Sequence, residues 1–254
     1  MHGEVWHGAE SSIGSRPATL ARSIGAMQAI VLADGDVGAR SDLDAAWPGW
    51  LEADALVVAA DGGARHASGL GLRIDRWVGD GDSLGADGVA ALRAAGVLVE
   101  LVEAAKDESD TELAIRTAVG LGAERVVILG GLGGPRVDHA LANIGLLALP
   151  ALRGVPACLL DPAARISLVS VPGDAVESVR RALPGPVGGL VSLLPQGSGV
   201  TGVTTAGLLY PLVDEPLPAG PARGLSNVRM SETASIVVRS GDLLVVEGPA
   251  TLST

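Results

Sequence analysis

Four short clusters of polar residues carry the side chains of this sequence that are best suited to chemistry. They are Asp61-Gly62-Gly63, Gly79-Asp80-Gly81-Asp82-Ser83, Lys106-Asp107-Glu108-Ser109-Asp110 and Arg136-Val137-Asp138-His139. Each follows an apolar run, so in an open α/β sheet all four lie at the carboxyl ends of strands, where ligands bind. We call these four clusters the rim. It is rich in carboxylates and also contains a lysine and an arginine.

The charges of the rim point to a class of reaction. Two carboxylates about 4 Å apart repel each other by about 4 kcal/mol at an effective dielectric of about 20. A bound hard cation relieves this repulsion, and phosphate is the natural second ligand of such a cation. The residue types therefore predict Mg²⁺-dependent phosphoryl transfer.

The second cluster is the clearest candidate for metal binding. Asp80 and Asp82 are two residues apart, so in an extended backbone both side chains point to the same side. Gly79 and Gly81 would let this backbone approach a ligand closely, and Ser83 would cap the next helix or donate to a phosphate. The alternative is an ordinary Asp-Gly turn. Because carboxylates suit Mg²⁺, we favour metal binding.

The third cluster has a structural explanation for only some of its residues. Residues 109–112 fit a capping box, with Ser109 at the N-cap and Glu112 at N3. Asp110 would then be the first helical residue, where the helix dipole stabilises a negative charge. Capping leaves Lys106 and Asp107 unexplained, and the role of Asp110 stays open.

The fourth cluster follows a glycine-rich run at residues 130–134. Backbone amides in such a turn can cradle an anion, and Arg136 can hold a phosphate with two hydrogen bonds. Asp138 can bind a metal or start the next helix, and His139 is expected at that helix start. A tight connection without a ligand is the alternative. The sequence contains neither the P-loop nor the dinucleotide-binding fingerprint.

Composition excludes several functions. The formal net charge of -11 argues against a nucleic-acid or anionic-membrane surface, because phosphate backbones recruit Lys and Arg. Cys158 is the only cysteine and lies in an apolar run, so we expect an inert buried thiol. With no N-terminal signal pattern and no apolar stretch long enough to span a bilayer, we expect a cytoplasmic protein.

The chain divides into three parts. Residues 1–26 lack periodicity and are expected to be a flexible extension. Residues 27–160 alternate apolar strands with helices, which predicts an α/β domain with a mostly parallel sheet and helices on both faces. Residues 161–254 consist of short apolar runs between Gly and Pro, which predicts a smaller antiparallel β-sandwich-like domain.

The expected elements follow from these patterns. In the first domain the strands are 29–33, 55–60, 76–78, 97–102 and 125–129, and the helices are 88–95, 111–120 and 138–149, the last closed by Pro150. In the second domain the strands are 166–171, 189–194, 199–204, 236–239 and 243–246.

Taken in order, the clusters resemble the motifs of the thiamine pyrophosphokinase (thiamine diphosphokinase) family. That family's D-G-G-A, G-D-x-D-S, K-D-x-T-D and G-G-R-x-D-H with a following L-x-N correspond here to residues 61–64, 79–83, 106–110, 134–139 and 141–143. Residues 207–212 (GLLYPL) and 226–227 (SN) resemble its C-terminal domain. The similarity extends over about residues 28–248. Three departures are Ser109 in place of Thr, Pro135 within the G-G-R run, and the lack of an aromatic residue after Asn227.

The resemblance implies a fold, a reaction and an assembly. It implies an N-terminal catalytic domain that binds ATP and Mg²⁺, and a C-terminal β domain that helps to bind thiamine. It also implies a homodimer with sites at the subunit interface. The implied reaction transfers the pyrophosphoryl group of ATP to the thiamine hydroxyl and releases AMP.

The implied roles fall on the rim and on one C-terminal turn. The catalytic residues would be Asp61, Asp82, Lys106, Asp110, Arg136 and Asp138. Contacts to ATP would come from Gly62, Gly63, Asp80, Ser83, Lys106, Asp107, Arg136 and His139. Asp80, Asp82 and Asp110 would hold Mg²⁺, Asp61 or Asp138 would be the general base, and Ser226 and Asn227 would bind thiamine.

Three other functions share some of these features. A pyrophosphokinase acting on another hydroxymethyl heterocycle, such as a pterin, would have the same rim and a different acceptor pocket. A non-catalytic sensor would bind ATP without forming AMP. A metal-dependent phosphohydrolase would release phosphate with no acceptor present. The number of acidic groups argues against the sensor.

Overall fold

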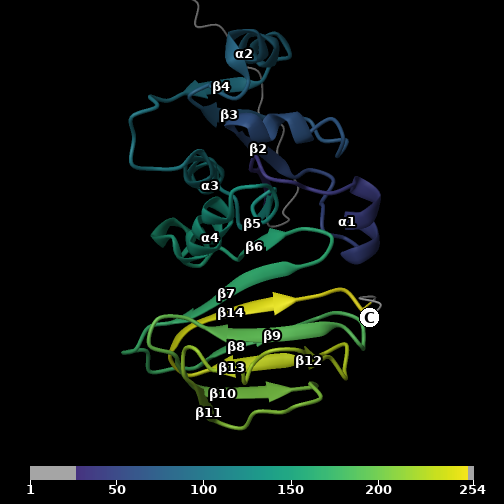
Figure 1. Cartoon of the computed structure of the whole chain (residues 1–254), viewed down its shortest axis with the longest axis vertical. Coiled ribbons are helices and arrows are strands. Elements are labelled where there is room, and N and C mark those ends of the chain that lie inside the picture. The colour runs from purple at the N-terminus through teal and green to yellow at the C-terminus, as the bar shows by residue number, and fades with distance from the viewer. Residues whose placement is uncertain (1–26, 251–254) are drawn as a thin grey trace, which may run out of the picture.

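Two regions of the molecule, one α/β and one all-β, share a continuous sheet (Figure 1). The computed structural model describes residues 27–250, so the extension predicted over 1–26 lies outside the described residues. The 10-stranded sheet has the order β12-β9-β14-β7-β6-β5-β1-β2-β3-β4. The ladder between β6 and β7 crosses residue 160, where the sequence predicts a domain boundary.

The parallel part of the sheet brings the strand ends of the rim together. It is formed by β1 (Gln28–Leu32), β2 (Leu56–Ala60), β3 (Arg76–Gly79), β4 (Leu98–Leu101), β5 (Arg125–Leu129) and β6 (Ala157–Leu160). β1 lies between β2 and β5, so the chain first moves outward to β4 and then returns to the other side of β1. The gap between the ends of β1 and β5 is therefore the topological switch point, where ligands bind in open α/β sheets.

Helices cover both faces of this parallel part. Alternate residues of β1 point to opposite faces, so Val31 packs in a cluster with Ile115, whereas Leu32 packs with Leu43. Ile115 belongs to α3 (Asp110–Gly120), which lies on the same side as α4 (Val137–Gly145) (Figure 1). The other face packs against α1 (Arg40–Ala46), α2 (Gly85–Ala94) and the segment after the 3-10 helix η1 (Asp61–His66). The predicted α/β class is confirmed. No helix among residues 27–250 is long and apolar enough to cross a membrane.

Beyond β6 the same sheet continues in antiparallel fashion and becomes one layer of a β-sandwich. That layer contains β7 (Arg165–Val171), β14 (Gly241–Glu247), β9 (Leu190–Pro195) and β12 (Asn227–Val228). The facing sheet has the order β11 (Glu215–Leu217), β10 (Val200–Ala206), β13 (Ser235–Val238) and β8 (Val179–Ala182). Buried aliphatic residues of both sheets form the core between them. The predicted antiparallel sandwich is confirmed.

The helices differ from prediction at α4, α2 and α1. α4 ends at Gly145, not at residue 149, and two 3-10 helices follow, η2 (Leu146–Ala148) and η3 (Pro150–Leu152). Pro150 begins η3 instead of closing a helix, because the fixed φ of proline suits a first helical position. α2 begins at Gly85, three residues before the predicted start. α1 was not predicted, since Leu43 is its one buried residue and leaves no helical period to detect.

Candidate active site

All four rim clusters lie where the sequence predicts them, at the carboxyl edge of the parallel sheet. The first follows β2 and forms the start of η1, and the second follows β3. The third connects β4 to α3, and the fourth connects β5 to α4. Each therefore combines a strand end with the approach to a helix, which places backbone N–H groups and acidic side chains at one edge.

Asp61 is the most unusual residue of the rim. Its φ of 37° lies in the left-handed region, which costs a non-glycine residue about 1–3 kcal/mol. Its side chain is buried, and Oδ1 has no hydrogen-bond partner among the described residues. The indole Nε1 of Trp77 donates to its carbonyl at 2.9 Å and so fixes the backbone. A strained, buried and unsatisfied carboxylate is typical of a functional position.

Glycines on either side allow Asp61 to sit this close to the sheet. A Cβ on Gly63 would lie 2.1 Å from the carbonyl oxygen of Leu32, at the end of β1. A Cβ on Gly79 would lie 2.8 Å from the Cβ of Asp61. No larger residue fits either position without moving backbone. Asp61 is therefore wedged between the ends of β1 and β3, next to Asp80.

The backbone at residues 80–82 forms a turn, so the prediction of an extended pair of aspartates is wrong. Asp80 Oδ1 accepts a hydrogen bond from the backbone N–H of Asp82 at 2.9 Å, and Gly81 has a φ of 86°. A short acidic side chain can satisfy its own backbone in this way, which competes with extended structure. Asp82 and Ser83 are exposed. Ser83 does not cap α2, whose N-terminus has no side-chain cap.

The third cluster has the predicted helix start together with an ion pair. Ser109 is the N-cap of α3 and accepts from the N–H of Glu112 at 3.2 Å, and Asp110 is the first helical residue. The Glu112 carboxylate binds Arg116 instead of returning to Ser109, so only half of the capping box forms. Lys106 Nζ lies 3.0 Å from Asp110 Oδ1.

That ion pair is poorly satisfied. Asp110 Oδ1 is buried and has no hydrogen bond of good geometry among the described residues, despite the nearby ammonium of Lys106. Both side chains are mostly buried, with 16% and 29% exposed for Lys106 and Asp110. Asp107 is exposed. Capping therefore does not account for Asp110, whose carboxylate keeps an oxygen that a ligand can use.

Arg136 and Asp138 form a bidentate ion pair on the surface. Arg136 Nε and Nη2 donate to the two carboxylate oxygens of Asp138 at 2.9 and 2.6 Å. These hydrogen bonds hold the pKa of the Asp138 carboxyl well below its usual range and raise the pKa of Arg136. Both side chains are 64% exposed, and His139 is exposed beside them. Because the pair is exposed, it can open when an anion competes for the guanidinium.

Sequence reasoning missed two charged residues that lie beside the rim. Asp34 follows β1, and its Oδ1 lies 3.0 Å from Arg65 Nη1. The residues Asp34-Gly35-Asp36 repeat the Asp-Gly-Asp spacing of 80–82 after another strand, which was a usable signal. Arg65 belongs to η1, and only the fold shows that η1 brings it back over the end of β1.

The glycine-rich loop after β5 packs against this first strand end. The N–H of Gly35 donates to the carbonyl of Gly130 at 2.9 Å, directly at the switch point. Asn143 on α4 donates from Nδ2 to the carbonyl of Gly131 at 3.0 Å and so fixes the loop to the helix. Asn143 therefore positions the loop instead of extending toward a ligand.

Ser226 and Asn227 lie far from the rim within one chain. Asn227 is buried, and its amide binds its own chain: Nδ2 donates to the carbonyl of Tyr210 at 2.7 Å, and Oδ1 accepts from the N–H groups of Tyr210 and Val228. Ser226 is exposed, with a φ of 56°. These residues stand at β12, which is six strand spacings from β1, or about 29 Å along the sheet.

The carboxylates of the rim fit Mg²⁺ only if substrate phosphates supply the remaining ligands. Within residues 27–250, no three His, Cys, Asp or Glu side chains are arranged to hold a metal ion. Mg²⁺ is commonly held by one or two carboxylates together with substrate phosphates, and not by a complete protein cage. The buried oxygens of Asp61 and Asp110 that lack hydrogen bonds match this requirement.

Comparison with known proteins decides the family. Residues 48–159 match the family model of the thiamin pyrophosphokinase catalytic domain, and residues 182–243 match that of the thiamin pyrophosphokinase vitamin B1 binding domain. The chain belongs to the thiamin pyrophosphokinase family. The catalytic-domain match contains all four rim clusters, and the vitamin B1 match contains Ser226 and Asn227. No curated protein sequence gives a significant match.

Solved structures of thiamin pyrophosphokinases share this fold over nearly their whole length. That of the Bacillus subtilis thiamine pyrophosphokinase is 23% identical, with a TM-score of 0.72, over 87% of this chain and 99% of the other. A thiamin pyrophosphokinase family protein from Enterococcus faecalis is 26% identical, with a TM-score of 0.69, over 87% and 98%. The yeast enzyme is 15% identical, with a TM-score of 0.68, over 91% and 88%.

Proposed function

We propose that this member of the thiamin pyrophosphokinase family transfers the pyrophosphoryl group of ATP to the hydroxyl of thiamine. The hydroxyl oxygen attacks the β-phosphorus in line, a new O–P bond forms, and the bond from the β-phosphorus to the α-phosphate oxygen breaks to release AMP. The observation that carries the proposal is the strained, unsatisfied Asp61 at the centre of a rim that lies within the catalytic-domain match.

The residues of the rim divide the work by position. Asp80, Asp82 and Asp110 do not form a complete metal site by themselves, so they would hold Mg²⁺ together with the substrate phosphates, on which the ion supplies charge neutralisation when it is bound. Lys106 would release Asp110, and Arg136 would release Asp138, so that each cation can neutralise negative charge on the transferring pyrophosphoryl group. Gly62, Gly63, Ser83, Asp107 and His139 complete the proposed ATP site. Such reactions depend mainly on positioning and electrostatics.

The two candidates for the general base are not equal in this structure. Arg136 keeps the pKa of Asp138 low, and a carboxylate with a low pKa is a weak base. Asp61 has no cationic partner on Oδ1 and lies at the end of β2, beside Asp80. We therefore assign to Asp61 the acceptance of the proton from the thiamine hydroxyl.

The acceptor half of the site points to a second copy of the chain. Ser226 and Asn227, the residues proposed for thiamine, are too far from the rim of their own chain to share a substrate with it. Around them Leu209, Tyr210 and Leu225 are exposed apolar side chains. Exposed apolar groups of this size commonly mark an interface. We propose a homodimer in which residues 27–160 of one copy bind ATP and residues 161–254 of the other bind thiamine.

Product analysis tests the reaction. The purified protein is incubated with ATP, Mg²⁺ and thiamine, and the products are separated by chromatography. We expect thiamine diphosphate and AMP in equal amounts. AMP formed only with a hydroxymethyl pterin would replace the acceptor and keep the chemistry. Phosphate released without an acceptor, or bound ATP without turnover, would contradict the proposal.

Mixing two defective variants tests the shared site. Asp82→Asn damages the rim, and Ser226→Gly removes the acceptor-side hydroxyl without adding strain at its positive φ. After subunit exchange, half of the dimers are hybrids with one intact site in two, so the mixture should recover about a quarter of the wild-type activity. The assay uses a thiamine concentration below the KM of the Ser226→Gly variant, so that weaker thiamine binding in this variant appears as a lower rate. A mixture no more active than its components would contradict the two-chain site.

A further inference from the structure

A cavity of about 250 Å³, on the face of the sheet that the α1–β2 connection covers, is not used by the proposed reaction. Its walls extend from Gln28 and Arg125, the first residues of β1 and β5, to Leu160 and Arg165, where β6 ends and β7 begins. The α1–β2 connection contributes Trp47 and Trp50, and the β-sandwich contributes Arg229. We call it the junction cavity, because both regions of the chain form its walls.

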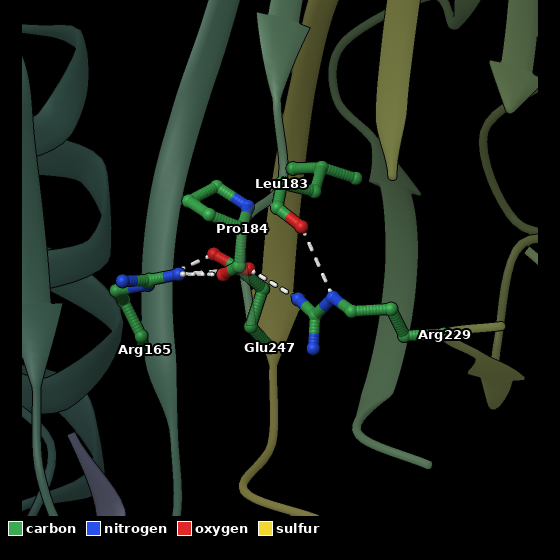
Figure 2. Close-up of polar contacts among 5 residues, drawn as sticks. All are labelled: Arg165, Leu183, Pro184, Arg229 and Glu247. Atoms are coloured by element: carbon green, nitrogen blue, oxygen red, sulfur yellow. Dashed lines mark hydrogen bonds and ion pairs between the residues drawn. The ribbon is translucent and has the colours of Figure 1, made fainter. Parts of the chain in front are cut away.

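Two arginines in its wall share a single carboxylate (Figure 2). Arg165 donates from Nε and Nη2 to Glu247 at 2.9 and 2.8 Å. Arg229 donates from Nη2 to Glu247 at 2.7 Å and from Nε to the carbonyl of Leu183 at 3.0 Å. Arg229 is 2% exposed and Glu247 is 3% exposed, so this cluster is removed from bulk water.

The cavity has more positive than negative charge. Arg125 binds Glu52, whereas Arg165 and Arg229 have only Glu247 between them, so one positive charge has no partner. Arg181, which lines an adjoining hollow with Arg165 and Glu247, adds another cation. Burial lowers the pKa of Arg229 and of Arg181, whereas Glu247 raises the pKa of Arg165, so the single carboxylate compensates Arg165 more fully than the other two.

Each guanidinium in the wall also has unused donors. The hydrogen bonds of Arg165 and Arg229 use Nε and Nη2, and neither Nη1 has a partner among residues 27–250. Arg125 uses only Nη2. Donors of this kind match a carboxylate, which can accept two parallel N–H groups from one arginine.

The remaining walls are apolar and rigid. Trp47 Nε1 donates to the carbonyl of Asp161 at 2.7 Å, and the Arg165 guanidinium lies 5.1 Å from the centre of the Trp47 ring. Trp50 Nε1 donates to Asp44 Oδ1 at 2.8 Å. Both indoles are therefore held in place before anything binds. Prolines supply much of the remaining wall, namely Pro48, Pro184, Pro186 and Pro249.

We propose that the junction cavity binds a small aromatic monocarboxylate. Its carboxylate would accept from the free Nη1 donors of Arg165 and Arg229, and its ring would lie against the indoles of Trp47 and Trp50. A single negative charge balances the unmatched guanidinium, and the volume leaves room for one ring. Because both regions of the chain line the cavity, such a ligand holds the α/β region and the sandwich together.

Benzoate is the probe, and benzamide is its neutral counterpart of the same shape. Binding is followed by tryptophan fluorescence and by the melting temperature of the full chain, at constant ionic strength. We expect saturable benzoate binding and a rise in melting temperature with concentration, because ligand that binds only the folded state stabilises it. Benzamide should bind at least about tenfold more weakly, since it lacks the charge-assisted hydrogen bonds.

The variants for this test are chosen so that the protein still folds. Replacing Arg229 would leave Glu247 short of a partner, so the informative changes are Arg125→Gln and Trp47→Leu. Arg125→Gln should weaken benzoate binding about fivefold or more, because Arg125 also lines the cavity and has donors that its pair with Glu52 does not use. The fold should tolerate this change, since the pair with Glu52 is exposed. Arg73→Gln is its matched control, because Arg73 is also paired on the surface, with Asp75, but lies outside the junction cavity.

The outcomes separate cleanly. Benzoate binding that weakens in Arg125→Gln and Trp47→Leu, and not in Arg73→Gln, supports the proposal. Equal binding of benzoate and benzamide overturns it, and so does equal loss in the two arginine variants. Binding of inorganic phosphate in place of benzoate also overturns it, since that result would describe a general anion site.

Discussion

Two buried carboxylates in different parts of the same sheet differ in how they are satisfied. Glu247, at the junction, is 3% exposed and accepts three hydrogen bonds from two arginines. Asp61, in the rim, is 7% exposed, has a φ of 37°, and has an oxygen with no partner among the described residues. The hydrogen bonds of Glu247 are supplied by its own chain, whereas Asp61 keeps an oxygen without one.

The difference separates structural from functional charge. A buried carboxylate whose hydrogen bonds are complete stabilises a particular arrangement of strands, here β7, β14 and the segment that carries Arg229. A buried carboxylate held under strain with an empty acceptor costs free energy that only a ligand recovers. Burial alone therefore does not identify a site residue; at Asp61 burial is combined with a missing partner and a strained backbone.

The largest expected effect comes from breaking the satisfied carboxylate. Glu247→Gln leaves Arg165 and Arg229 without a counter-charge and should reduce the free energy of unfolding by about 3–5 kcal/mol. Urea denaturation measures the loss. The matched control is Glu52→Gln, which breaks an exposed pair with Arg125 and should cost less than about 1 kcal/mol. Similar losses in both variants would contradict a structural role specific to Glu247.

Removing the unsatisfied carboxylate should have the opposite effect on stability. Asp61→Gly relieves the strain of a positive φ, so the free energy of unfolding should rise by about 1 kcal/mol. Activity should fall at least about 100-fold, because the proposed general base is gone. Asp214→Gly is the control, since Asp214 also has a positive φ, of 53°, and lies outside the rim. A stable, active Asp61→Gly enzyme would remove Asp61 from the mechanism.

A smaller effect distinguishes the two serines of the rim. Ser109 caps α3, so Ser109→Ala should cost about 1 kcal/mol of unfolding free energy. Ser83 is exposed and caps nothing, so Ser83→Ala should stay within about 0.5 kcal/mol. Thermal and urea unfolding measure both. If Ser83→Ala instead lowers affinity for ATP at unchanged stability, its proposed contact with a phosphate gains support.

The smallest effect concerns Cys158, beside the junction cavity. Burial raises the pKa of its thiol to about 11, above the ordinary value of about 9. A raised folded pKa means that the neutral thiol stabilises the protein below pH about 9, and that this contribution is lost as the pH rises toward 11. The difference in free energy of unfolding between the wild type and Cys158→Ala should therefore be smaller at pH 10.5 than at pH 8. Alkylation of the native protein at pH 8 should be slow. Rapid native alkylation would contradict the predicted inert thiol.

Local patterns were sufficient for much of the fold and for the position of the rim. Strict strand and helix alternation over residues 27–160 predicts the parallel sheet, because the hydrophobic period reflects which face is buried. The N-cap at Ser109 and the first helical position of Asp110 were also predictable, since capping involves neighbours in sequence. At Asp80 the sequence offered the turn only as the alternative, because a side chain that binds its own backbone leaves no periodic trace.

What the sequence determined by itself is the alternation of strands and helices that carries the rim, although α1 and β6 were missed, and the set of acidic groups at the carboxyl edge. The tertiary structure alone decided which of those groups stay unsatisfied, and that β6 joins the two regions into one sheet. It also decided that Arg165 and Glu247, 82 residues apart, share one buried cluster. The physical reason is that sequence patterns record local hydrogen bonding and burial. Whether a charge finds a partner depends on strands that pair from distant parts of the chain.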